Sequence, residues 1–338
     1  MTRGRIAIVV AAAAAAVMPV PADLVERWYS SLAYPRMQHV LTPISNVFPF
    51  ALFDVLCVAA VCAFAIATRR HVRRLGWKRG ALRVAGVTLV SAAAAYLVFL
   101  ATWGLNYRRV PIREKVAFDP VRVSSAAARD LGELNAAALN RLSAAAHRTP
   151  LSLDALASSF DAAIRRMGAS TGTVPGRPKE TLLGGYFHEI TISGMTDPFL
   201  LETLLAPDLL DVERPFVIAH EWAHLAGYAD ESEANFIAWL TCRHGDALAQ
   251  YSAALVLIGY APPGRPLRDV LDIAPRLDLW AMQYRYATTS AVVRAAARRG
   301  YDTYLKANRV EKGVESYDAV VQLILGTELD ESQYPRRR

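Results

Sequence analysis

Long apolar runs are confined to the first third of the chain, and alternating apolar and polar positions follow. The three runs are Ile6–Val20, Val47–Thr68 and Ala81–Leu105. A helix needs roughly 20 apolar residues to cross a bilayer, and the second and third runs reach that length. The pattern therefore predicts a membrane domain over residues 1–107, with two or three transmembrane helices at about 4–22, 47–68 and 82–105.

The first run is short for a span, at about 15 residues. Arg3 and Arg5 precede it, and the small residues of "VPA" before Asp23 are where a signal peptidase would cleave. The run fits either a signal peptide or, extended to either side, a first membrane anchor. We favour the anchor.

Basic residues are distributed unevenly around these runs. The segment "RRHVRRLGWKRG" (69–80) carries six Lys and Arg, whereas the connection 21–46 carries two. Cytoplasmic loops are enriched in Lys and Arg, so 69–80 is predicted to be a cytoplasmic loop. The third span then delivers residues 108–338 to the outside as an extracytoplasmic domain, although four basic residues within 108–115 reduce the contrast.

Composition favours membrane attachment and argues against nucleic acid as a partner. Hydrophobic residues make up 53% of the 338 residues, charged residues make up 20%, and mean hydropathy is +0.19. The net charge of +7 comes with no basic face interleaved with aromatic residues, so membrane lipid is the expected partner. Three cysteines form no CxxC motif and no disulfide framework.

The remainder of the chain is predicted to be mainly helical with a small sheet, an α+β arrangement. Ser124–His147 and Ser152–Ser170 have helical periodicity and serine caps, and Gly168 is placed to stop the second helix. "YFHEITISG" (Tyr186–Gly194) alternates apolar and polar residues as a strand does. Further helices are expected at about 247–258, 267–279 and 288–299, and the segments 301–310 and 316–326 close the domain.

The stretch "HEWAH" places His220, Glu221 and His224 in an HExxH pattern. Positions i and i+4 of a helix share a face, so both imidazoles can reach one metal ion, and zinc suits their nitrogens. Glu221 points about 100° round the helix, where it can act as general base on a zinc-bound water. Pro215 is placed to start this helix and Gly227 to end it.

Two other interpretations of this stretch agree less well with the sequence. A surface helix would carry Lys or Arg on its free face, and there is none between Pro215 and Ala229. An intramembrane site would need a longer apolar segment, because charged residues bound this one on both sides. The site is therefore expected in the soluble domain.

A catalytic zinc takes three protein ligands and a water, so one more ligand is required. Asp230, Glu231 and Glu233 are the candidates. Spacing alone allows Asp230, which follows a glycine turn. Asp230 and Glu233 also form a capping box for the next helix, which occupies both acids and favours Glu231. Asn235, one turn after Glu231, could then hydrogen-bond a ligand. All three acids stay candidates on this reasoning.

Several segments resemble one known bacterial family. They are "WGLNYRRVPI" after the last run, "ISGMTDPF", "PFVIAHEWAHLAGYADESEANFIAWL" and the closing "YDTYLKANRV…SYDAVVQLIL". Over most of its length the chain is similar to the family called domain of unknown function 3810, membrane proteins with N-terminal spans and a zincin-like domain. The resemblance implies a multi-pass protein of the bacterial inner membrane with Zn²⁺ as its cofactor.

The segment "ESEAN" also resembles gluzincin-like groups, in which the first acid after HExxH binds zinc. Carried over, that acid is Glu231, and Asn235 takes the position of the supporting residue. The stretch "SGMTDPFLLETLLAP" departs from the family pattern, so details of the substrate cleft do not carry over.

Other residues have candidate roles beside the motif. By the same resemblance, the segment "HEITISG" is a candidate edge strand for pairing with extended substrate, and an ordinary core strand is the alternative. Tyr228, Tyr301 and Tyr304 could each stabilise an oxyanion, although a tyrosine more often serves packing. His188 is expected to be a surface histidine or a hydrogen-bonded one rather than a metal ligand.

Together these features predict a membrane-anchored zinc metallopeptidase that acts on a peptide or protein. His220, His224 and Glu231 hold the metal, and Glu221 activates the water that attacks a peptide carbonyl. Two alternatives stay open. One is a zinc-binding envelope protein without proteolytic activity, in which Glu221 would have no use. The other is a zinc amidase acting on cell-wall peptide, which the sequence does not separate from a peptidase.

Overall fold

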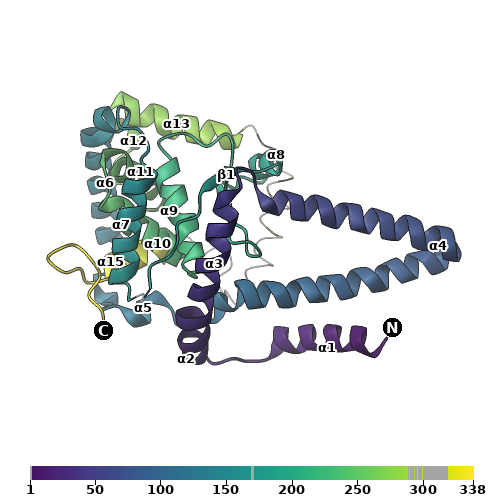
Figure 1. Cartoon of the computed structure of the whole chain (residues 1–338). Coiled ribbons are helices and arrows are strands. Elements are labelled where there is room, and N and C mark those ends of the chain that lie inside the picture. Colours follow the sequence, from purple (N-terminus) through teal and green to yellow (C-terminus); the bar gives the residue numbers. More distant parts are fainter. Residues whose placement is uncertain are drawn as a thin grey trace.

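A helical body carries a long helical hairpin that projects from one side in the computed structural model (Figure 1). The structure describes residues 2–168, 171–287 and 319–338, together with positions 289, 293, 295 and 299. Tyr301 and Tyr304, the segment 301–310 and most of the helix predicted at 288–299 lie outside the described residues.

The described elements are mainly helical, as predicted. In chain order the helices are α1 (Arg3–Val17), α2 (Ala22–Leu24), η1 (Val25–Ala33, π-helical), α3 (Tyr34–Val47), α4 (Leu52–Thr102), η2 (Gly104–Arg108), α5 (Ile112–Lys115), η3 (Pro120–Arg122), α6 (Ser125–Ala146), α7 (Leu153–Arg166), α8 (Gly184–Glu189), α9 (Arg214–Leu225), α10 (Glu231–Arg243), α11 (Ala247–Tyr260), α12 (Leu267–Val270), α13 (Ile273–Ala287) and α15 (Ala319–Gly326).

One small sheet accompanies these helices. It is formed by β1 (Pro178–Glu180), β2 (Gly194–Thr196) and β3 (Thr203–Leu205). β3 lies in the centre, parallel to β1 and antiparallel to β2. β2 packs against α9, so the sheet contributes one strand to the neighbourhood of the HExxH helix.

α4 is the one helix among the described residues that is long and apolar enough to cross a membrane. It bends back on itself at Gly76, whose φ of +74° is accessible to glycine without strain (Figure 1). Each arm is about 36–39 Å long at 1.5 Å per residue, more than the roughly 30 Å of a hydrocarbon core. The predicted spans 47–68 and 82–105 fall largely on these arms. The prediction that residues 69–80 form a loop is wrong, because only Gly76 within them departs from helical geometry.

α1 packs beside α4, and the chain then turns sharply into α2, η1 and α3. The two helical stretches meet at 111°, at the sequence "PVP" where prolines interrupt the helix. Tyr34, Gln38 and Thr42 of α3 are each at most 1% exposed and face the body. The predicted division at residue 107 assigns this segment to the membrane domain, yet its buried side chains contact the body.

α9 and α10 form the centre of the body. Every residue of α10 from Glu231 to Cys242 is buried, and α9 is buried except at Arg214 and His220. α7, α11 and α15 pack against α10, and α6 packs against α11. Because neighbours cover both helices on all sides, neither needs a charged outer face. This arrangement agrees with the uncharged flanks of the HExxH motif.

The strand predicted at Tyr186–Gly194 is wrong over most of its length. α8 occupies its first part, and β2 begins only at Gly194. Phe187 is 1% exposed and packs against Ala51 and Leu204, a contact that one helical turn makes without a strand partner. The apolar alternation of this segment therefore indicated correctly that it is buried, but it predicted a strand where the backbone is helical.

Candidate metal centre

α9 begins and ends where the sequence predicts. Pro215 lies in its first turn, and Gly227, with φ of +82°, reverses the chain after it. A Cβ at position 227 would lie 2.9 Å from Oδ1 of Asn106 and 3.1 Å from the ring of Tyr34, so glycine is required for space as well. This tight turn lets α10 start at Asp230 and pack against the face of α9 that carries the histidines.

The two histidines and one acid bring three ligand atoms together. Nε2 of His220 lies 3.1 Å from Nε2 of His224 and 3.2 Å from Oε2 of Glu231, and the remaining His224–Glu231 separation is 3.7 Å. Ligands about 2.0–2.1 Å from a tetrahedral zinc ion are roughly 3.4 Å apart from one another. The separations in the protein therefore match those of a zinc site.

Both imidazole rings are oriented by contacts of their other nitrogen. Nδ1 of His220 lies 2.9 Å from Oδ1 of Asn235, and Nδ1 of His224 lies 2.7 Å from the carbonyl oxygen of Tyr228. These oxygens only accept hydrogen bonds, so each ring donates from Nδ1 and presents a lone pair at Nε2. Two lone pairs and a carboxylate oxygen then converge, and a cation between them removes their repulsion.

The pKa shifts within the cluster also indicate a site that attracts a cation. Burial by itself would lower the pKa of His224, but the carboxylate of Glu231 raises it to about 9. Burial would raise the pKa of Glu231, yet the two histidines hold that pKa well below its usual value. Without a metal the cluster thus binds a proton strongly, and the same field attracts a metal cation.

Of the three candidate acids, Glu231 is the one that joins the histidines within the described residues. Asp230 caps α10 as predicted, since its carboxylate accepts hydrogen bonds from the backbone N–H of Ser232 and Glu233. The prediction that Glu233 completes the capping box with Asp230 is wrong. Oε1 of Glu233 accepts instead from the backbone N–H of Ile112, at 2.6 Å, because the start of α5 offers it an unpaired donor.

Glu221 occupies a separate, buried position on α9 and is 3% exposed. Oγ1 of Thr196 lies 2.8 Å from its carbonyl oxygen and 2.9 Å from its Oε2. A Cβ on Gly194 would lie 2.8 Å from its Oε1, so β2 passes directly over the carboxylate. Burial raises the pKa of Glu221, although both histidines oppose the rise. A carboxylate with a raised pKa suits proton transfer.

Residues next to the membrane-length helix cap the C-terminal end of α9. Nε1 of Trp103 donates to the carbonyl of His224 at 2.9 Å, and the hydroxyl of Tyr34 donates to that of Leu225 at 2.9 Å. Arg109 donates to the carbonyl of Gly227 at 2.8 Å. The Trp103 and His224 ring centroids are 6.0 Å apart. Sequence reasoning missed these contacts because no local pattern links residues so far apart.

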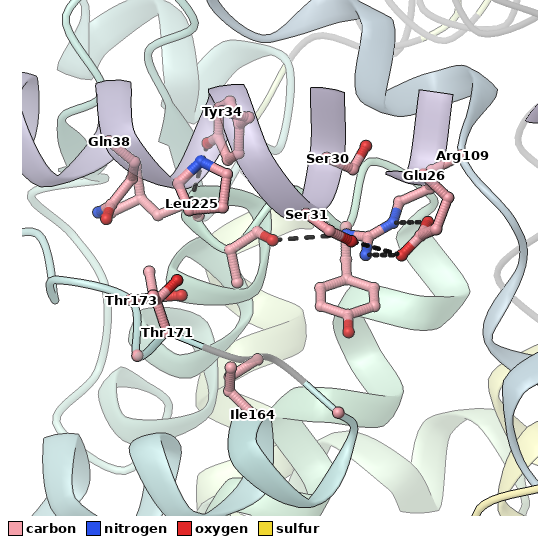
Figure 2. Close-up of a pocket in the computed structure, with 15 residues that line it drawn as sticks. Glu26, Ser30, Ser31, Tyr34, Gln38, Arg109, Ile164, Thr171, Thr173 and Leu225 are labelled. Atoms are coloured by element: carbon pink, nitrogen blue, oxygen red, sulfur yellow. Dashed lines mark hydrogen bonds and ion pairs between the residues drawn. The ribbon is translucent and has the colours of Figure 1, made fainter. Parts of the chain in front are cut away.

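A small cavity of about 70 Å³ lies beside this cap. Figure 2 shows Tyr34 and Gln38 toward one end of it and the paired side chains of Glu26 and Arg109 toward the other. None of the residues of the His–His–Glu cluster lines it, so the cavity is separate from the candidate metal centre.

Two other residues with predicted roles lie elsewhere. His188 contacts Asp208 at 2.7 Å and is not among the residues of the candidate metal cluster. The ring of Tyr228 is covered by the guanidinium of Arg109 at 4.1 Å, and it is the backbone carbonyl of Tyr228 that contacts the cluster. Burial in that environment raises the pKa of the Tyr228 hydroxyl.

The fold and the cluster define a class: a mainly helical protein with a membrane-length apolar helix and a largely buried His–His–Glu group. The chain belongs to the family described as protein of unknown function (DUF3810), whose model matches residues 29–263 and 270–325. The match includes α9 and α10, and thus the whole cluster. No curated protein and no solved structure matches the chain.

Proposed function

We propose that this protein is a membrane-anchored zinc metallopeptidase. The observation that carries the proposal is the convergence of His220, His224 and Glu231, at ligand separations of 3.1–3.7 Å. Two imidazoles and one carboxylate leave a fourth tetrahedral position open, which is the arrangement of catalytic rather than structural zinc sites. The Nδ1 contacts of both rings add the outer support that metal-binding histidines require.

Zinc bound by these three residues would lower the pKa of a coordinated water and polarise a substrate carbonyl. Glu221 accepts the proton of the attacking water and delivers it to the amine of the departing peptide. The hydroxyl of Thr196 fixes the orientation of the Glu221 carboxylate. Burial of Glu221 keeps bulk water from competing for the proton.

A peptide substrate fits the open edge of β2. Among the described residues this strand pairs with β3 on one side only, and both Gly194 and Thr196 lie against Glu221. An extended peptide added along that edge would pass beside the general base, and its main chain would be held by ladder hydrogen bonds. This placement favours a polypeptide substrate over a small molecule.

The proposal includes a location: both arms of α4, together with α1, cross the bacterial inner membrane, and the body lies outside the cytoplasm. The six basic residues of 69–80 surround the bend of α4, at the far end from the body (Figure 1). α1 begins with Arg3 and Arg5 and has its N-terminus directed toward the same end. Positive charge at one end of all these helices marks the cytoplasmic side.

The test uses the full chain purified in detergent. Wild type is expected to hold one zinc per chain by elemental analysis, His220→Ala to lose it, and His188→Ala, the matched control, to keep it. Glu221→Gln is expected to keep zinc and to cleave a quenched fluorescent random peptide library at least about 100-fold more slowly.

Each alternative predicts a different result. A wild-type chain without metal would refute the zinc centre. Zinc without Glu221-dependent cleavage of any peptide would favour the non-proteolytic envelope protein. Glu221-dependent cleavage of cell-wall peptide fragments, with the random library left intact, would favour the amidase.

A further inference from the structure

The segment α2–η1–α3 exposes a row of apolar side chains, while several of its polar side chains are buried beside Val25 and Tyr34 on the face toward the body. The polar side chains that face the body, each at most 4% exposed, are Ser30, Gln38, Thr42 and Ser45. The apolar side chains that face outward, each 37–77% exposed, are Leu24, Trp28, Leu32, Val40, Ile44 and Val47. Helices in water bury the apolar face, so this orientation indicates that the outer face is in contact with lipid.

The buried polar face is fully used by the body. Gln38 exchanges two hydrogen bonds with the backbone of Val174, at 2.7 and 3.1 Å. Thr42 donates to the carbonyl of Leu201 at 3.1 Å. These contacts fix which face of the segment points outward, so the exposure of its apolar stripe is a consequence of specific bonding.

The segment also lies between the two ends of the hairpin. α4 starts shortly after α3, where the backbone N–H groups of Leu52 and Phe53 bond to the carboxylate of Glu202. The second arm returns beside η1, where the hydroxyl of Tyr29 donates to the carbonyl of Ala101. Figure 1 shows α3 running between these two points, across the side of the body from which the arms project. When the arms cross a bilayer, α2–η1–α3 therefore lies along its surface.

The charges on the outer face suit a phospholipid surface. Arg27, Arg36 and His39 are exposed among the apolar side chains. Helices that lie in a membrane interface combine an apolar stripe with basic residues, which contact anionic headgroups. A bilayer therefore accounts for both the apolar and the basic residues of this face.

The candidate metal centre lies at nearly the same height. From Arg83, the last basic residue of the second arm, to Trp103 the helix rises about 30 Å, the thickness of a hydrocarbon core. Trp103, which is buried against the body, is then at the level of the boundary. Its ring centroid is 6.0 Å from that of His224. The centre thus lies at the depth of the headgroups.

We propose that α2–η1–α3 is an interfacial helix in the headgroup layer, and that it holds the metal centre at that depth. The substrate is then a polypeptide attached to the same membrane, cut within a few residues of the point where it leaves the bilayer. The depth follows from the fold once the arms of α4 cross the bilayer, as proposed above. The substrate class rests on the proposed peptidase function.

Depth is tested with spin labels on the full chain in nanodiscs of phosphatidylethanolamine and phosphatidylglycerol. Cys57 and Cys62 are replaced by alanine, and buried Cys242 is left in place. Labels at Trp28→Cys and Ile44→Cys are expected to have a ratio of oxygen to nickel-chelate accessibility several-fold above that of Ile273→Cys. The control is also an exposed isoleucine, at the start of α13 and outside the segment α2–η1–α3. Equal ratios at all three positions would overturn the inference.

Substrate class is tested in vesicles of the same lipids. A random peptide library is coupled to lipid directly in one sample and through a long polyethylene glycol spacer in the other, and released fragments are identified by mass spectrometry. The directly coupled library is expected to be cut within about four residues of the lipid, about 13 Å of extended chain, at a rate within threefold of the spaced library.

Cleavage of the spaced library alone would place the centre well above the membrane and overturn the substrate class. If neither library is cut while the labels report headgroup depth, the peptidase proposal and the substrate class are both refuted. The interfacial position of α2–η1–α3 is supported by the same result. Glu221→Gln serves as the inactive control in both samples.

Discussion

The hydroxyl of Tyr34 joins the end of α9 to the helix that precedes α4, and Tyr34→Phe removes this contact alone. The variant keeps the aromatic ring and deletes one oxygen. Tyr34 is 1% exposed, Leu225 is fully buried, and among the described residues no other donor contacts the Leu225 carbonyl. The substitution therefore leaves a buried carbonyl without a partner.

Such a carbonyl costs about 1–3 kcal/mol of unfolding free energy. A loss near 2 kcal/mol corresponds to a Tm roughly 4–8 °C lower for a body of this size. The carbonyl of His224 is less dependent on its side-chain donor Trp103, because it also accepts a hydrogen bond from the backbone N–H of Gly227 at 2.9 Å.

The assay is scanning fluorimetry of the full chain in detergent, with and without zinc. Tyr29→Phe is the matched control, since its hydroxyl also donates to a carbonyl, that of Ala101, in a partly exposed position where water can replace it. We also expect Tyr34→Phe to weaken zinc binding in competition with a chelator, because the turn after α9 orients His224. Equal Tm shifts for Tyr34→Phe and Tyr29→Phe would refute this account of the cap.

Three further predictions concern other parts of the molecule. A fragment of residues 116–338 lacks five buried side chains of the main hydrophobic cluster, and their burial contributes about 8–15 kcal/mol, comparable to the whole stability of a domain. We therefore expect the fragment to show no cooperative unfolding transition by circular dichroism. A sharp transition would contradict the packing. Gly194→Ala would push the carboxylate of Glu221 aside, so peptide cleavage should fall at least tenfold while zinc content stays at the wild-type level; unchanged cleavage would show that β2 does not position the base. Burial raises the pKa of Asp197 to about 7 from an ordinary value of 3.8, so the neutral carboxyl favours the folded state. The stability that this neutral form contributes, up to about 4 kcal/mol, is lost as pH rises from about 4 to about 7. Asp197→Asn should therefore show a smaller fall in Tm between pH 5 and pH 8 than wild type, and equal falls would argue against the shift.

The sequence by itself determined the local features of the candidate centre. The spacing of His220 and His224 put both rings on one helical face, and the absence of charge around them indicated a buried helix. Proline at the start and glycine at the end gave the limits of α9, and Asp230 gave the first cap of α10. These features depend on contacts within about one helical turn, which is the range over which periodicity and capping act.

The identity of the acid that joins the histidines was only favoured by the sequence, because the argument relied on a complete capping box. In the structure Glu233 bonds to Ile112, 121 residues away, and Glu231 faces the histidines because of how α10 packs on α9. The predicted strand that became α8 failed for a related reason. Apolar alternation records which side chains are buried, whereas the backbone depends on which partner strand lies within reach.

The position of the candidate centre beside the ends of the apolar helices was decided by tertiary structure alone. It depends on hydrogen bonds that join Tyr34 to Leu225 and Trp103 to His224, across 191 and 121 residues. Hydrophobic runs in the sequence showed which helices could enter lipid. Only packing could bring the ends of those helices against the end of α9, because side-chain bonds between distant segments follow from the three-dimensional fit of buried surfaces and leave no periodic trace in the sequence.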